Sequence, residues 1–195
     1  MKKFISFSFS IAFFAILFVS CNPSSSCKSD TCAKVISEQS VRDVDAVLTH
    51  AAQLQGKQVE IEGVCTHICK HGGRKIFLMG SDDTRTIRVE AGEVRQFDQK
   101  CVNSIVRVKG ILHEERIDEA YLQQWETSLA QQTEKKHGES EAGCSTEKKA
   151  RGETANSSKD RIRQFRQRIA EQKEKNGKDY LSFYHITASG YTIQE

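Results

Sequence analysis

The sequence predicts a mainly β domain with helical additions: a five-stranded Greek-key barrel, preceded by one helix and carrying a helical insertion before its last strand. Three observations lead to this fold class. Four segments between residues 57 and 112 alternate apolar and polar side chains. Helical periodicity returns twice after residue 116, and residues 180–193 are again rich in aromatic and β-branched side chains.

A helix is expected ahead of the barrel. Ser40 is its candidate N-cap, because acidic Asp43 follows three positions later. Gly56 is expected to end this helix, whose apolar face comprises Val44, Val47, Leu48 and Ala51.

Turn signals separate the strands that follow. His71-Gly72-Gly73 ends the first strand and Asp82-Asp83 ends the second. The predicted strands are 58–69, Lys75–Met79, Thr84–Glu90 and Ser104–Leu112.

The insertion is expected at about residues 116–176. Its first helix has the apolar positions Ile117, Tyr121, Leu122, Trp125 and Leu129. Residues 131–158 are charged and small and predict a linker or long loop. A second helix, ended by Gly177, has apolar positions Ile162, Phe165 and Ile169. Its arginines are interpreted as a solvated face: Arg161, Arg163, Arg166 and Arg168.

The barrel segment resembles a known fold family. GKQVEIEGVCTHICKHGGRKIFLMG, followed by RTIRVEAGE and VNSIVRVKGIL, is similar to the OB-fold domains of small exported bacterial proteins of unknown function. The resemblance covers about residues 56–113, together with the terminal strand. It implies a fold, and fold-level analogy does not transfer a function.

The N-terminus predicts export. Lys2 and Lys3 precede an uninterrupted run of apolar and small residues from Phe4 to Ser20, which is typical of a signal peptide over residues 1–20. Its removal would lower the formal net charge from +3 to +1, so no strong field attracts the chain to nucleic acid.

Cys21 directly follows this run and resembles the lipobox cysteine of bacterial lipoproteins, although Phe18 stands where that family usually has an aliphatic residue. The resemblance implies cleavage before Cys21 and acyl chains, such as palmitate, on the new N-terminus. Asn22 then implies the outer membrane of the cell envelope, facing the periplasm. An ordinary cleaved signal peptide with an incidental cysteine is the alternative.

Residues 21–39 form a polar tether ahead of the domain at 40–195. An oxidising compartment would permit disulfides among the six remaining cysteines. These are Cys27, Cys32, Cys65, Cys69, Cys101 and Cys144.

Four residues of metal-ligand type lie close together in the first strand: Cys65, His67, Cys69 and His71. Thiolate and imidazole are ligands that zinc and copper prefer. Further ligands or partners are expected among Cys101, His137, Cys144 and His185. Because an exposed lone thiol is a liability outside the cytoplasm, Cys144 is expected to lie close to Cys65 or Cys69.

The direction of these side chains depends on Gly63. A β-bulge there would turn Val64, Thr66 and Ile68 into the core and leave Cys65, His67 and Cys69 on an outer face. We favour the bulge, because burying His67 without a partner costs more than burying Thr66.

The leading hypothesis is therefore a non-enzymatic, membrane-anchored binding module, with zinc or copper as its ligand. A disulfide-stapled or thiol-redox envelope protein is the alternative. A third hypothesis is an OB-type barrel that binds a polymer; nucleic acid is not the expected partner, because this compartment holds little of it. We find no catalytic motif in the sequence, and no protein partner is indicated.

Overall fold

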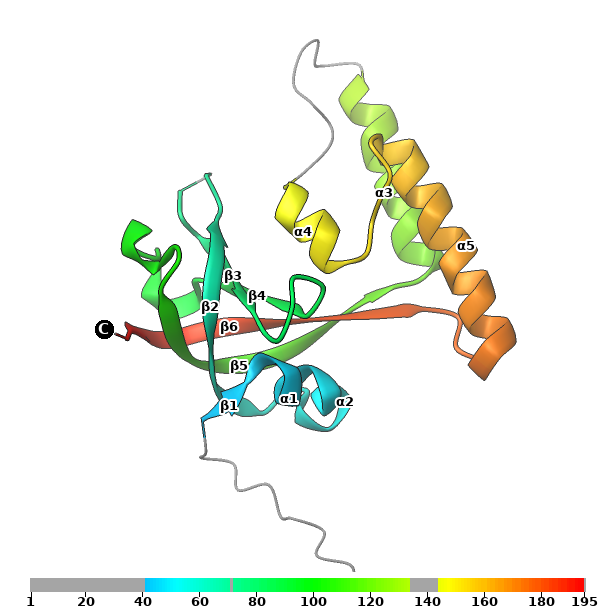
Figure 1. Ribbon diagram of the computed structural model, residues 1–195. Coiled ribbons are helices and arrows are strands. Elements are labelled where there is room, and N and C mark those ends of the chain that lie inside the picture. The colour runs from blue at the N-terminus through cyan, green and yellow to red at the C-terminus, as the bar shows by residue number, and fades with distance from the viewer. Residues whose placement is uncertain (1–40, 71, 134–143, 195) are drawn as a thin grey trace, which may run out of the picture. The chain divides into compact units, whose positions relative to one another are not determined.

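Five strands form a closed barrel, in which the first barrel strand along the chain pairs with the fourth (Figure 1). The computed structural model describes residues 41–70, 72–133 and 144–194. The barrel strands are β2 (Gln58–Ile68), β3 (Lys75–Met79), β4 (Thr86–Glu90), β5 (Ile105–Ile117) and β6 (Leu181–Ile193). They follow the order β2-β3-β4-β6-β5, with β2 and β5 paired to close the ring and β4 parallel to β6. The predicted OB-like, mainly β fold is confirmed.

The N-terminal helix is shorter than predicted and divided in two. Strand β1 (Arg42–Asp43) pairs in parallel with β2. Asp43 caps α1 (Val44–Thr49) by accepting a hydrogen bond from the backbone N–H of Ala46, and α2 (Ala51–Leu54) follows. The predicted cap Ser40 lies outside the described residues. Both helices bury their apolar side chains in the barrel core: Val44, Val47, Ala51 and Leu54.

The barrel core contains the inward-facing side chains of every strand. Two short 3₁₀ helices, η1 (Gly92–Val94) and η2 (Gln99–Cys101), lie between β4 and β5. Phe97 lies between them and is buried, with its ring 5.1 Å from that of Tyr191. The largest buried side chains of this cluster are Ile61, Ile76, Leu78, Ile87, Phe97, Leu112 and Ile186.

The irregularity in β2 lies after Cys65 and not at Gly63. The register between β2 and β3 shifts between Cys65 and His67. Cys65 is fully buried, whereas Val64 is 37% exposed and Thr66 is exposed. The expected bulge at Gly63 is therefore wrong, and so is the expected outward direction of Cys65.

With the shift after Cys65, the polar side chains of Thr66 and His67 stay out of the barrel core. A free cysteine behaves as a small apolar residue, so burial of Cys65 is inexpensive. Beyond the shift, Ile68 lies in the core as predicted and His67 lies on the outer side, half-buried.

Close packing explains the glycine at position 63. A Cβ atom there would lie 2.8 Å from Val44 Cγ2 and 2.9 Å from the carbonyl oxygen of Met79. The glycine thus lets α1 pack directly against β2 and β3.

The insertion is carried by the two longest strands. Strands β5 and β6 pair from Val106–Ile193 to Ile117–Leu181 and lead to α3 and α5 (Figure 1). The inserted helices are α3 (Glu119–Thr133), α4 (Ser145–Ala150) and α5 (Ser158–Asn176). A second apolar cluster joins α3 and α5 to the ends of these strands: Ile117, Leu122, Ile162, Phe165, Ile169 and Leu181.

The ends of α5 match its sequence signals. The side chain of Ser157 accepts a hydrogen bond from the backbone N–H of Asp160 at the start of the helix. Gly177 ends the helix with a positive φ of 75°.

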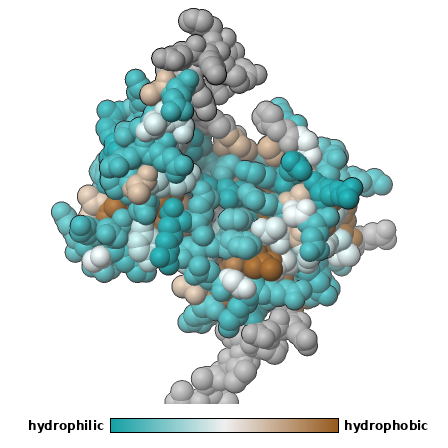
Figure 2. All heavy atoms as spheres, turned by 180° about the vertical axis from the view of Figure 1, so that it is seen from behind, coloured by the Kyte–Doolittle hydropathy of each residue, from teal (hydrophilic) through white to brown (hydrophobic). Residues whose placement is uncertain are grey.

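Two expectations about the insertion change. The long loop predicted at 131–158 contains α4, and residues 134–143 lie outside the described part of the chain. The signal peptide 1–20 and the tether 21–39 also lie outside it. None of the helices within the described ranges is long and apolar enough to span a membrane. The face in Figure 2 is mainly hydrophilic.

We predict that Gly63→Ala destabilises the fold by about 1–3 kcal/mol. The added methyl group would meet a backbone carbonyl that strand pairing holds in place. Urea unfolding measures the loss. Gly190→Ala is the matched control, because a Cβ at Gly190 meets nothing within 4 Å. Equal stabilities of the two variants would contradict this packing argument.

Candidate functional site

The cysteine and histidine cluster of β2 is divided between two environments. Cys65 lies in the barrel core, and its thiol donates a hydrogen bond to the carbonyl oxygen of His67 (3.6 Å). Burial, with a further contribution from Cys101, raises the pKa of Cys65 to about 11. Cys65 is therefore a neutral thiol at pH 7, which makes it a poor nucleophile and a poor metal ligand.

His67 and Cys144 meet on the outer side of the barrel. Cys144 Sγ lies 3.5 Å from His67 Nε2, and the imidazole ring packs against Phe77 at 5.8 Å. The insertion thus contacts the first barrel strand through His67. The expected closeness of Cys144 to Cys65 or Cys69 stays a prediction.

The remaining candidates are dispersed. Cys69 lies in the turn after β2, where its backbone N–H donates to the carbonyl of Lys75 (2.8 Å). Cys101 is buried in the core, and burial raises the pKa of its thiol. His185 lies on β6 and stacks on His113, with ring centroids 5.4 Å apart. Cys21, Cys27, Cys32, His71 and His137 lie outside the described residues.

No group of three or more histidine, cysteine, aspartate or glutamate side chains within the described ranges could hold a metal ion. The four cysteines in these ranges carry free thiols. A disulfide among them stays a prediction.

A different set of charged residues forms a site where α4 lies on the barrel. Arg88 of β4 donates to Glu147 of α4 and to Glu115 of β5, the latter at 3.0 Å. Arg151, just after α4, contacts the same two carboxylates at 3.2 and 2.7 Å. The two arginine side chains are 11% exposed and the two glutamates 23%. We call these four residues the ion network.

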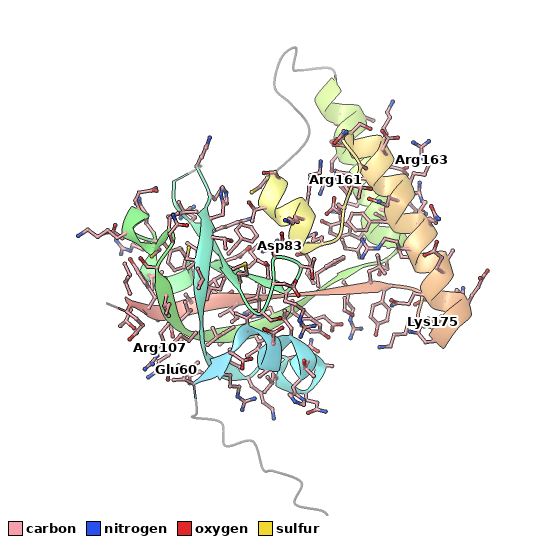
Figure 3. The ribbon with its side chains drawn as sticks, viewed as in Figure 1. Glu60, Asp83, Arg107, Arg161, Arg163 and Lys175 are labelled. Atoms are coloured by element: carbon pink, nitrogen blue, oxygen red, sulfur yellow. The ribbon has the colours of Figure 1, made fainter. Side chains whose placement is uncertain are left out.

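Within the ion network, the two arginines offset the free-energy cost of burying the ionised carboxylate of Glu147. Burial opposes ionisation of Glu147, but Arg151 and Arg88 outweigh it, so the pKa of this carboxyl lies below its ordinary value. Lys149 adds an exposed ion pair with Asp83, the residue that Figure 3 labels beside α4. Since α4 has no buried residue, these polar contacts hold it on the barrel.

Two clefts open beside the ion network, and both are lined in part by it. The arginine cleft, of about 420 Å³, is lined by Arg85, Arg88, Arg151, Arg168, Phe183 and Tyr184, among others. The aromatic cleft, of about 430 Å³, also contains Tyr121, Trp125, Cys144 and Arg161. Volumes of this size suit small-molecule ligands.

The last helix therefore does not present its arginines as one solvated face. Arg161 pairs with buried Glu153 and lies over the ring of Trp125 at 4.8 Å. Arg168 lies in the arginine cleft. Arg163, in contrast, is 78% exposed, and Figure 3 shows it on the side of α5 away from α4.

Sequence reasoning missed the ion network. Arg88 and Glu115 stand at outward positions of their strands, which ordinarily indicates solvated residues. The network is completed by Glu147 of α4, whose polar sequence predicts no helix. The weak available signal is the Glu147–Arg151 spacing, which suits an ion pair within one helical turn.

The comparisons with known proteins add little. The chain matches no protein-family model, and no curated protein gives a significant match. One similar solved structure, from Leishmania major Friedlin, is assigned as an aspartyl-tRNA synthetase. It is 16% identical over 43% of this chain and 17% of that chain, with a TM-score of 0.28. A likeness this weak carries no functional argument.

We predict that Glu147→Gln loosens α4. The change removes the α4 carboxylate that Arg88 and Arg151 share, at a local cost of about 1–3 kcal/mol. Hydrogen exchange of the amides in residues 145–150 should become about tenfold faster or more. Glu126→Gln is the control, because Glu126 pairs with Arg166 at an exposed position.

In the unaltered chain, lowering the pH should loosen α4 as Glu147→Gln does, because protonation also removes the charge of Glu147. A carboxyl whose pKa is lowered on folding stabilises the fold above its unfolded pKa, near 4.3, and ceases to do so as the pH falls through the folded value. The protection factors of the α4 amides, taken against the intrinsic exchange rate at each pH, should therefore fall below about pH 4, and Glu147→Gln should lack that fall. Unchanged exchange in Glu147→Gln at neutral pH would refute the role of the ion network.

Proposed function

We propose that this protein is an exported, lipid-anchored binding module that acts without covalent chemistry. Its ligand lies between the barrel and the inserted helices. The observation that carries the proposal is the return of the insertion to the barrel, where α4 contacts β4 and the two clefts form.

The position of the clefts within the fold supports binding. OB barrels bind their ligands on the face of their second and third strands, aided by the loops after the first and fourth strands. In this chain those strands are β3 and β4, and the insertion follows the fourth barrel strand, β5. The insertion thus contributes walls to the surface that this fold uses for recognition.

A thiophilic metal held by Cys65, His67, Cys69 and His71 receives less support. Cys65 faces the core as a neutral thiol, so the ligand set would need partners from outside the described residues. Burial also raises the pKa of both Cys65 and Cys101, so within the described residues a thiol-redox role would fall to the half-buried Cys69 and Cys144.

The anchor is proposed from the N-terminal sequence. Acylated Cys21 would hold the protein on the outer membrane, since several buried acyl chains together give firm attachment. The tether at 21–39 would then place the barrel in the periplasm.

A ligand panel tests the binding function. Thermal unfolding of the full chain in detergent is followed with zinc ions, inorganic phosphate, benzoate and oligothymidylate, each added separately. We expect at least one class to raise the melting temperature. Ala150→Trp, which fills the arginine cleft, should abolish that rise.

Ala170→Trp is the control for this panel. Ala170 is exposed on α5 and does not line the arginine cleft. A ligand that stabilises both tryptophan variants equally, or a panel without any effect, counts against a binding site between barrel and insertion.

We predict that Cys21→Ser releases the protein from the membrane or blocks its processing, because serine offers no thiol for lipid attachment. Membrane fractionation and the mass of the mature chain measure both outcomes. Full membrane association of a variant cleaved at the same bond would contradict the lipid anchor.

A further inference from the structure

Arg168 differs from every other arginine of the arginine cleft. Its guanidinium donates one hydrogen bond, to the backbone oxygen of Arg151 at 2.8 Å, and lies 5.7 Å from the rings of both Phe165 and Phe183. Within the described residues it has no carboxylate within 4 Å. It is also partly buried, and burial lowers its pKa.

The other cleft arginines have acidic partners. Arg85 pairs with Asp45 at 2.6 Å. Arg88 and Arg151 share the two carboxylates of the ion network. Arg168 is therefore the arginine of this cleft without a direct ion pair among the described residues, and Glu153 and Glu171 act on it only at longer range.

Arg88, which lines the same cleft, has an unpartnered donor of its own within the described part of the chain. The Nε atom of Arg88 is buried and has no hydrogen-bond partner among the described residues. Buried donors normally have partners, so each such group calls for an explanation. That donor is closed to solvent and does not face a ligand in the open cleft, so the assignment of the cleft depends on Arg168.

The surroundings of Arg168 prepare it for recognition. Two aromatic rings and one backbone acceptor restrict the guanidinium, which leaves most of its five N–H groups for a ligand. A planar guanidinium held in this way suits bidentate binding of a carboxylate or phosphate. Arg151 also lies over the ring of Phe183, at 5.2 Å, so two guanidinium groups contact this ring.

We propose that the arginine cleft is an oxyanion site, in which Arg168 binds the carboxylate or phosphate group of a small organic ligand. The rings of Phe183 and Tyr184 on the cleft wall would contact the apolar part of that ligand. This assignment rests on the proposed binding function and names the chemistry of its ligand.

Isothermal titration of the full chain in detergent tests the site with two probes, inorganic phosphate and benzoate. The probe that binds more tightly identifies which oxyanion the site prefers. Arg168→Met retains a side chain that packs against both phenyl rings, and should weaken binding of the preferred probe at least about tenfold. Arg163→Met is the matched control: it removes the same charge from an exposed position of the same helix and should bind as the unaltered chain does.

Arg168→Lys separates recognition from packing. Lysine keeps the charge but lacks the planar fork, so this variant should bind more weakly than the unaltered chain and more tightly than Arg168→Met. A lower melting temperature with unchanged probe affinity in both variants would make Arg168 a packing residue and overturn the site.

The two proposals fail in different ways. Absence of binding by both anions overturns the oxyanion site, while stabilisation by zinc or oligothymidylate that Ala150→Trp abolishes would still support a binding module. Equal affinity of the Arg163→Met and Arg168→Met variants likewise overturns the role of Arg168 alone.

Discussion

The pairing of β5 with β6 is the constraint on which the rest of the structure depends. These strands hold the barrel together at one end of their ladder, through pairs such as Val106–Ile193. At the other end, Ile117 and Leu181 belong to the apolar cluster that joins α3 and α5. One continuous ladder therefore supports both apolar clusters, and it sets the position from which the inserted helices return to the barrel. The β5–β6 ladder and the inserted helices form walls of the two clefts.

The contact of α4 with the barrel is of a different kind. Apolar burial holds α3 and α5, whereas α4 buries no residue and is held by Glu147 and Lys149 through ion pairs. Buried ion pairs return little net stability, because desolvation offsets their attraction, but they demand one geometry. This wall of the clefts is therefore held in place by charge pairing, with no buried side chain of α4 behind it.

The Cys/His cluster shows why closeness in sequence is a poor measure of a site. Alternation along a strand sends neighbours to opposite faces, and a single irregularity after Cys65 separates that thiol from His67. The interior then takes the cysteine as an apolar residue, while His67 meets Cys144 from 77 positions along the chain. The charged residues that do converge, Arg88 and Glu147, come from separate segments whose sequences carry no site motif.

The sequence by itself determined the strands, the two long inserted helices and the closed barrel, because alternation, helical periodicity and turn residues such as Gly177 are local signals. Tertiary structure alone decided where β2 changes face, since close packing of Gly63 against α1 and the low cost of burying Cys65 outweighed the local preference for a bulge at glycine. It also decided that α4 forms and that Arg168 lines a cleft without a direct ion pair to any carboxylate of the described ranges. Both outcomes depend on charges brought together from distant segments, and no local pattern encodes such an encounter.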